Sequence, residues 1–159
     1  LAVSFGTSHI DTMEKTIDVL EKEFAKTFEE AVVYRAFTSN MIIKKLKRTA
    51  NIKVQTVGEA LEKMAADGIE EVIVQPTHVI NGIENDRMLQ EVMEHMHLFR
   101  KVYVGKPLLS SVEDYKKAIH AVMEKTVIGE DEMLVLMGHG TDHHANSAYP
   151  TLELSLIHI

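Results

Sequence analysis

The sequence contains no cysteine, which excludes disulfide bonds, thiolate metal sites and cysteine nucleophiles together. It also lacks any apolar run close to the roughly 18 to 20 residues that a membrane-crossing helix needs, so we expect no membrane span. Positive charge is scarce as well. Seventeen lysines and arginines against 24 acidic residues give a net charge of −7, which argues against a nucleic-acid partner because phosphates need a basic surface.

Histidine, by contrast, is abundant, with nine residues in the chain. Imidazole suits borderline divalent metals such as cobalt, nickel, iron and zinc, so the composition favours a metal-related function. The overall composition, 45% hydrophobic and 26% charged over 159 residues, is typical of a globular protein of about one domain.

Short apolar runs alternate with amphipathic stretches along the whole chain. Val72, Ile73 and Val74 follow one another without a break, which is typical of a strand buried on both faces. The repeated alternation predicts an α/β fold with a mostly parallel sheet flanked by helices on both faces. We expect strands at 3–5, 31–37, 71–75, 101–105 and 133–137, and helices near 11–24, 39–46, 56–68, 84–98 and 112–125.

Three helix starts carry capping signals. Asp11 is expected to cap the first helix, with Glu14 three residues on, and Ser39 can cap the next. Thr56 and Glu59 have the spacing of a capping box, in which each side chain bonds the backbone N–H of the other residue.

Polar and glycine residues concentrate where the expected strands end. In parallel sheets, ligands bind beyond the carboxyl ends of the strands, so these loops are the expected binding region. The loops are Gly6-Thr7-Ser8-His9, Phe37-Thr38-Ser39-Asn40, Pro76-Thr77-His78, Gly105-Lys106-Pro107 and Gly138-His139-Gly140.

The strongest local signal is the stretch Met-Gly-His-Gly-Thr-Asp-His-His at 137–144. His139 lies between two glycines, so its ring could face a ligand and its metal, or it could be a structural turn residue. His143 and His144 fall where the next helix should begin, and the simpler interpretation is two surface residues. His139 and His143 have H-x-x-x-H spacing, but that spacing binds metal only on one helix, which the glycines disfavour.

Other polar positions carry weaker signals. Gly6-Thr7-Ser8 precedes a helix, a geometry that favours carboxylates or phosphates, although the lysine and glycine spacing of a P-loop are absent. His78 ends the third strand, where the simpler interpretation is a hydrogen-bonded structural histidine and a ligand contact is the alternative. A basic run on the second helix is expected to be a solvated face, and its members are Lys44, Lys45, Lys47 and Arg48.

Five separated segments, taken in order, resemble the anaerobic sirohydrochlorin cobaltochelatases, which are class II chelatases. Together they cover nearly the whole chain through Tyr149, which makes their joint match far more specific than any single motif. The segments are VSFGTSHIDTMEKTI, YRAFTSNMIIKKL, VQPTHVINGIEND, VGKPLLSSVEDY and MGHGTDHHANSAY.

The resemblance implies two similar α/β halves with a tetrapyrrole bound in the cleft between them. It implies a metal site made by the histidine of Met-Gly-His-Gly, a glutamate and a second histidine. Only the first has a match here, His139; the other two should lie beyond residue 153. The expected substrate contacts are Thr7, Ser8, Thr38, Ser39 and His78.

His139 is expected to act both as metal ligand and as proton acceptor. Inserting Co²⁺ into the macrocycle removes two pyrrole protons while the metal exchanges its ligands for ring nitrogens. Neutral imidazole coordinates borderline cations, and histidine titrates near working pH. One nitrogen cannot do both at once, so the two roles would follow one another.

The chain is expected to be an N-terminal fragment. Residues 1–128 would be the first chelatase half and 129–153 the truncated start of the second. Residues 154–159 resemble an in-frame translation of a sequencing adapter, with an apolar strand as the alternative. Because two of three metal ligands would be missing, we expect the fragment itself to be inactive.

The expected reaction is insertion of Co²⁺ into sirohydrochlorin, or its reduced precursor, in anaerobic cobalamin biosynthesis, with the metal as substrate and no organic cofactor. The alternatives are the same fold inserting iron or nickel, or a non-catalytic carrier of tetrapyrrole or metal. A dinucleotide-binding domain is disfavoured because Gly-x-Gly-x-x-Gly is missing after the first strand. We expect a cytoplasmic protein, leaving export and a homo-oligomer open.

Overall fold

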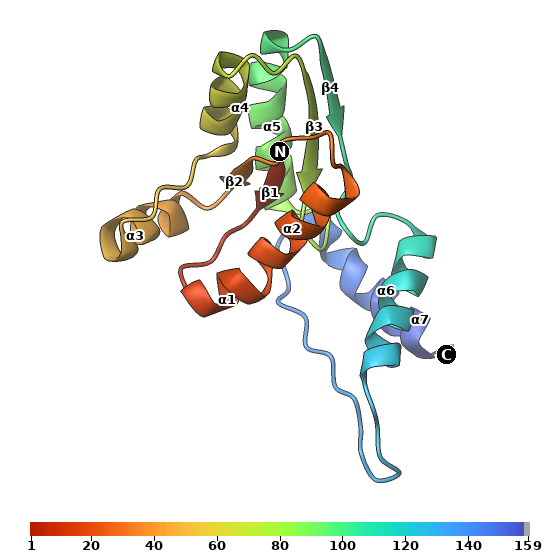
Figure 1. The fold of residues 1–159 in the computed structure, drawn as a ribbon. Helices are drawn as coiled ribbons and strands as arrows, with labels where there is room; N and C mark the ends of the chain where they lie inside the picture. The colour runs from red at the N-terminus through yellow and green to blue at the C-terminus, as the bar shows by residue number, and fades with distance from the viewer. Residues whose placement is uncertain (158–159) are drawn as a thin grey trace.

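The structure is a computed structural model that describes residues 1–157 (Figure 1). Its four strands form one sheet in the order β2-β1-β3-β4, with every neighbouring pair parallel. This arrangement confirms the predicted α/β fold. The strands are β1 (Ala2–Ser4), β2 (Arg35–Phe37), β3 (Glu71–Pro76) and β4 (Lys101–Val104).

Helices connect the strands and follow the last one. They are α1 (Ile10–Lys15), α2 (Ile17–Thr27), α3 (Asn40–Ala50), α4 (Val57–Ala66), α5 (Ile83–His95), α6 (Val112–Lys125) and α7 (Ala148–Ile157), with 3₁₀ turns η1 (Met96–Leu98) and η2 (His144–Ser147).

Two of the three expected caps are confirmed. The Ser39 hydroxyl accepts the N–H of Ile42 at the start of α3, and Thr56 with Glu59 forms a complete capping box on α4. The expectation for Asp11 is wrong, because α1 begins at Ile10 and its N-cap is His9. Asp11 lies inside the first turn, where its negative charge still complements the helix dipole.

The core lies on both sides of the sheet. Because side chains alternate along a strand, Ala36 of β2 faces α4 and α5 while its neighbour Phe37 faces α1, α2 and α3. The first cluster includes Val3, Val57, Leu61, Val72, Val74, Met88 and Val92. The second is formed by Met13, Ile17, Phe37, Leu46 and Val54.

The expected burial of β3 on both faces is wrong. Val72 and Val74 are buried under α4 and α5, but Ile73 on the opposite face is 54% exposed, and Tyr103 beside it on β4 is 45% exposed. The helix that follows β4 does not cover this face, because α6 packs against α7 in a separate small cluster around Tyr115.

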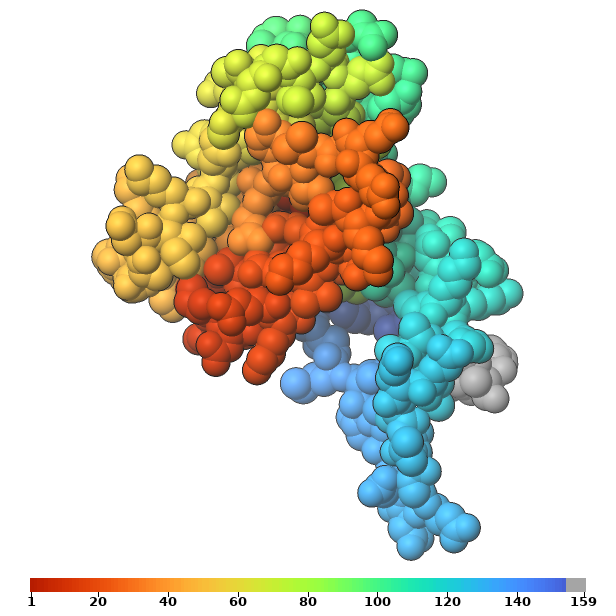
Figure 2. All heavy atoms as spheres, in the orientation of Figure 1, coloured from red at the N-terminus to blue at the C-terminus, as the bar shows by residue number. Residues whose placement is uncertain are grey.

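The predicted strand at 133–137 does not form, and residues 126–143 contain neither helix nor strand. Figure 2 shows part of this segment extending away from the body, and Met137 is 94% exposed. A strand needs a neighbour to satisfy its backbone, and the described part of the chain pairs none with this apolar run.

The C-terminal tail is helical rather than extended. Helix α7 continues through Ile157, so the backbone of 154–157 is not the strand that was the alternative to an adapter-derived tail. The last two residues of that expected tail, 158–159, lie outside the described residues. Within 1–157, no helix combines the length and apolarity needed to cross a membrane.

Candidate functional site

The carboxyl ends of the three strands β2, β1 and β3 lie side by side, as expected. The N–H of Thr38 donates to the Ser4 carbonyl at 2.9 Å, and the N–H of Thr77 donates to the Val3 carbonyl at 2.8 Å. The Ser4 and Thr77 hydroxyls share a 2.8 Å hydrogen bond. This backbone pairing carries three of the expected loops to one edge of the sheet.

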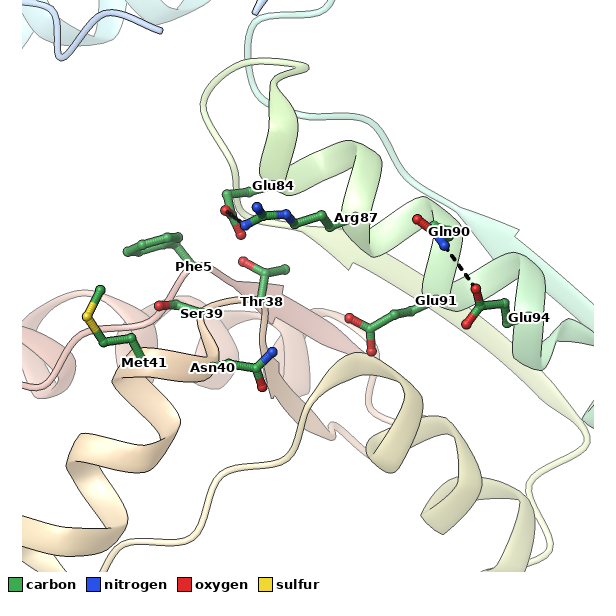
Figure 3. A pocket seen from close by; sticks show the side chains of 10 residues that line it. All are labelled: Phe5, Thr38, Ser39, Asn40, Met41, Glu84, Arg87, Gln90, Glu91 and Glu94. Atoms are coloured by element: carbon green, nitrogen blue, oxygen red, sulfur yellow. Dashed lines mark hydrogen bonds and ion pairs between the residues drawn. The ribbon is translucent and has the colours of Figure 1, made fainter. Parts of the chain in front are cut away.

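A cleft of about 540 Å³ opens at this edge, between the start of α3 and the side of α5 (Figure 3). Two of the predicted substrate contacts, Thr38 and Ser39, line it. Glu84 and Arg87 reach into it from α5, and their side chains form an ion pair with 2.6 Å between Arg87 Nη1 and Glu84 Oε1. The full lining is Phe5, Thr38, Ser39, Asn40, Met41, Glu84, Arg87, Gln90, Glu91 and Glu94.

The cleft carries more negative than positive charge, with three carboxylates and one guanidinium. Part of that charge is already engaged. Glu91 Oε2 accepts the N–H of Gly58 at 2.7 Å, in the first turn of α4, where the helix dipole stabilises an anion. Glu94 Oε1 accepts from the Gln90 amide at 3.1 Å.

Buried polar atoms without a hydrogen-bond partner gather at the same edge. Among the described residues they belong to four side chains: Thr38, His78, Glu84 and Asn85. Thr38 is only 8% exposed and follows β2, while Glu84 and Asn85 lie in the first turn of α5. Such atoms are rare in folded proteins, so their concentration in one place marks this edge as a site that a ligand or water completes.

His78, at the end of β3, is not the hydrogen-bonded structural histidine considered from the sequence. Both of its ring nitrogens are buried and unpartnered. Burial lowers the pKa of the ring below its ordinary value of 6.5, and the nearby negative charge of Glu84 partly opposes that shift. The ring is therefore held neutral, with one nitrogen free to accept a hydrogen bond and the other free to donate one.

The Gly6-Thr7-Ser8 loop lies beside this cleft but does not line it. Gly6 has a φ of +98°, in the left-handed region that glycine adopts most readily. The Thr7 hydroxyl accepts the N–H of His9 at 3.2 Å, and both Thr7 and Ser8 are partly exposed. The structure thus brings Thr38 and Ser39 together with Glu84, with Thr7 and Ser8 in the neighbouring loop.

His139 is exposed and lies on the irregular segment after α6. Within residues 1–157, no three histidine, aspartate or glutamate side chains come together as a metal site. His139 and His143 do not share a helix, which confirms that their spacing is not a helical metal pair.

The interpretation of His143 as a surface residue is wrong, because only 13% of its side chain is exposed. Its Nε2 lies 3.0 Å from Asp86 Oδ2 on α5, and its Nδ1 accepts the N–H of Ala145 at 3.2 Å. His144 is exposed, as expected, with its ring 3.8 Å from that of His143 between centroids.

Sequence reasoning missed Glu84, Arg87 and Asp86. Glu84 and Arg87 share one face of α5 with Glu91 and Glu94, at spacings of three and four residues. In a sequence, this pattern indicates only a solvated helix face. By contrast, the basic run on α3 is solvated as predicted, since all four of its cations are exposed.

Comparison with known proteins supplies the family. The pattern of the family described as cobalt chelatase (CbiK) matches residues 1–158. A sirohydrochlorin cobaltochelatase of Salmonella typhimurium strain LT2 is 42% identical over 154 residues, which is 96% of this chain and 58% of that protein. The sirohydrochlorin cobaltochelatase CbiKC of Nitratidesulfovibrio vulgaris strain Hildenborough is 32% identical over 96% of this chain and 55% of its own length. The chain therefore spans somewhat more than half the length of these relatives, and it belongs to the cobalt chelatase (CbiK) family.

Proposed function

We propose that this chain is part of an enzyme that inserts Co²⁺ into sirohydrochlorin, or its reduced precursor, in anaerobic cobalamin biosynthesis. Family membership and the names of both relatives support this activity. Residues 1–128 would form the first half of the enzyme and residues 129–153 the start of the second, with the tetrapyrrole between the halves.

The observation that carries the proposal is the set of unpartnered polar atoms at the carboxyl edge of the sheet. A tetrapyrrole brings carboxylates, which accept hydrogen bonds, and pyrrole N–H groups, which donate them. The Thr38 hydroxyl can donate to a carboxylate, and the free oxygen of Glu84 can accept from an N–H group. The neutral ring of His78 can do either.

The substrate is anionic and the chain is net acidic, so local donors must offset repulsion. The start of α3 is suited to this, since the first N–H groups of a helix have no partner within the helix and carry partial positive charge. Ser39, Asn40 and Met41 place that helix start in the cleft, with Arg87 opposite. Thr7 and Ser8 would contact the substrate from the adjoining loop.

His139 would bind Co²⁺ and accept a pyrrole proton in successive steps. A neutral imidazole can do both, but not with one nitrogen at the same moment. We assign the remaining ligands, a glutamate and a second histidine by family resemblance, to the part of the relatives' length that this chain does not span.

The decisive experiment follows metallation by the change in the absorption spectrum of sirohydrochlorin, using a protein completed to the length of its relatives. His139→Ala should slow insertion by about 100-fold or more, as expected for loss of a proton acceptor and ligand. The matched control is His144→Ala, which removes an exposed neighbour and should retain most activity. Insertion at the normal rate by His139→Ala would refute the role of this residue.

The 159-residue chain offers a second test. It should bind sirohydrochlorin without metallating it, and Ser8→Ala should weaken that binding; turnover by the chain alone would contradict the assignment of the missing ligands. Competition among Co²⁺, Fe²⁺ and Ni²⁺ in the longer protein would identify the metal, because imidazole and carboxylate ligands separate these ions poorly. Binding without metallated product in the longer protein would favour a carrier.

A further inference from the structure

We propose that Asp86 and His143 are positioning residues that hold the His139 segment against the first half of the enzyme. This inference rests on the proposed role of His139. Its basis is the contact between His143 Nε2 and Asp86 Oδ2, 3.0 Å apart, which joins residues separated by 57 positions in the sequence.

The hydrogen bonds around His143 define which nitrogen carries the proton. The N–H of Ala145 donates to Nδ1 at 3.2 Å, so Nδ1 is an acceptor and carries no hydrogen. The ring hydrogen therefore lies on Nε2 and is donated to the Asp86 carboxylate. A neutral ring makes both contacts at once, and the contact involves a charged acceptor, which strengthens it.

The segment around His139 is held by its own contacts as well. The Thr141 hydroxyl accepts the N–H of His143 at 3.2 Å, and Asn146 Oδ1 accepts the N–H of Thr141 at 3.3 Å. Tyr149 packs against Gly138, where an added Cβ would stand 2.5 Å from the ring. The chain is thus held at Gly138 and at Thr141, on either side of His139, so fixing His143 restricts where His139 can lie.

Asp86 is placed to determine where that segment docks. It lies in the first turn of α5, two residues from Glu84, whose unpartnered oxygen belongs to the cleft. The His143–Asp86 contact therefore sets the position of His139 relative to the carboxyl edge that would hold the tetrapyrrole. The contact matters because residues 126–143, between α6 and η2, contain neither helix nor strand, so the end of α6 does not by itself fix the position of His139.

The test compares Asp86→Ala, His143→Ala and the double variant in the completed enzyme. Each single change should lower kcat by about 10- to 100-fold with little change in KM for the tetrapyrrole, since misplacement of a reacting group slows the chemical step. If both residues act through one contact, the double variant should be no slower than the slower single variant. Losses that multiply instead would overturn the proposal.

Two further variants separate positioning from folding. In His143→Gln the side-chain amide can still donate near the Nε2 position, so activity should recover several-fold relative to His143→Ala. Asp142→Ala changes an exposed carboxylate in the same segment and should leave kcat unchanged. A fall in kcat that instead followed the melting temperature across all variants would overturn the positioning role.

The proposal can also fail independently of the proposed function. Normal metallation by His139→Ala would refute the function of that residue, whereas an inactive His139→Ala together with fully active Asp86→Ala and His143→Ala would refute only the positioning. In the 159-residue chain, Asp86→Ala should accelerate hydrogen exchange at the amides of Thr141, His143 and Ala145 by about tenfold, because local opening becomes easier. Unchanged exchange there would refute the contact itself.

Discussion

Gly6 lies against the ring of Phe37, so close that a Cβ added to it would stand 2.4 Å from Phe37 Cδ2. The glycine also has a φ of +98°, which side chains rarely adopt. Phe37 is fully buried at the end of β2, next to Thr38 in the cleft. The loop after β1 therefore packs directly against the residue that precedes Thr38 in the cleft wall.

Replacing Gly6 should destabilise the fold by more than the backbone strain of a positive φ would alone. Gly6→Ala should lower the free energy of unfolding by at least about 2 kcal/mol, because backbone strain and a clash with a buried ring add. Gly68→Ala is the matched control: φ there is +83°, but no atom lies within 4 Å of the added Cβ. It should cost about 1 kcal/mol, the strain alone. Urea unfolding of both variants measures the difference, and equal losses would contradict the clash.

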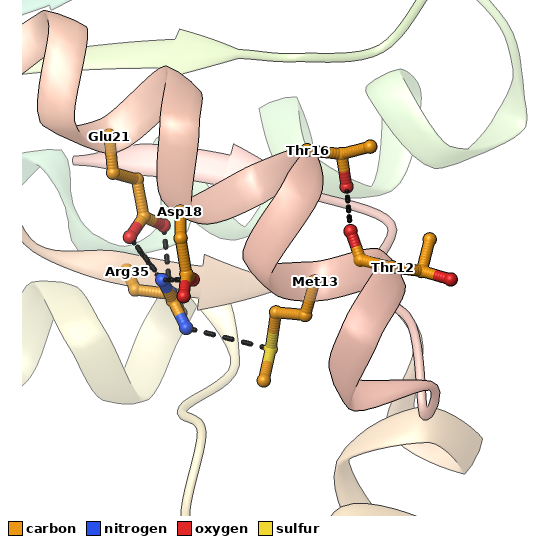
Figure 4. Close-up of polar contacts among 6 residues, drawn as sticks. All are labelled: Thr12, Met13, Thr16, Asp18, Glu21 and Arg35. Atoms are coloured by element: carbon orange, nitrogen blue, oxygen red, sulfur yellow. Dashed lines mark hydrogen bonds and ion pairs between the residues drawn. The ribbon is translucent and has the colours of Figure 1, made fainter.

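Arg35 joins β2 to α2 through two carboxylates (Figure 4). Its Nε donates to Glu21 at 2.8 Å, and its Nη2 donates to both Glu21 and Asp18. Arg35→Met should lower the free energy of unfolding by about 1–2 kcal/mol, at the lower end for charged hydrogen bonds because the side chains are partly exposed.

An exposed ion pair on the same helix provides the control. Lys26 and Glu23 are separated by 3.8 Å and are 77% and 61% exposed, so Lys26→Met should change stability by less than about 0.5 kcal/mol. The loss for Arg35→Met should also shrink as salt is added. A salt-independent loss would indicate that packing, rather than charge, holds α2 in place.

Thr38 should respond to substitution in opposite directions for stability and for binding. Its hydroxyl is buried without a partner, so Thr38→Val should leave the free energy of unfolding unchanged or raise it by up to about 1 kcal/mol. Binding of sirohydrochlorin should weaken by about fivefold to tenfold, because the donor to a carboxylate is lost. The matched control, Thr77→Val, breaks the hydrogen bond to Ser4 and should destabilise by about 1 kcal/mol. Destabilisation by Thr38→Val would show that its hydroxyl has a partner inside the protein.

The buried His78 should make stability depend on pH. Its pKa in the folded chain lies below 6.5, first because of burial, so the unfolded chain takes up the proton first as pH falls below that value. The free energy of unfolding should therefore decrease as the pH is lowered below 6.5, by at most about 1.4 kcal/mol per pH unit, until the folded ring is also protonated. His78→Gln should remove this part of the slope below pH 6.5, whereas His9→Gln, at an exposed position, should not. An unchanged profile for His78→Gln would contradict the shift.

The local signals of the sequence predicted local structure well. Ser39 and the Thr56–Glu59 pair identified two helix starts correctly because capping joins groups only three residues apart. The alternation of strands and helices was sufficient to predict the parallel sheet. It was also sufficient to predict that Thr38 and His78 lie at the same edge of that sheet. The segment at 133–137 looked like a strand for the same local reason, but a strand also requires a neighbour, which its own residues cannot supply.

The amino-acid sequence by itself determined the fold class, the family and most helix starts, since periodicity, capping and motif order are all written along the chain. Only the tertiary structure decided that Glu84 and Arg87 line the same cleft as Thr38 and Ser39, that His78 lacks hydrogen-bond partners, and that His143 contacts Asp86. These are contacts between elements, and a residue's burial and partners depend on what packs against it, which its neighbours in sequence do not specify.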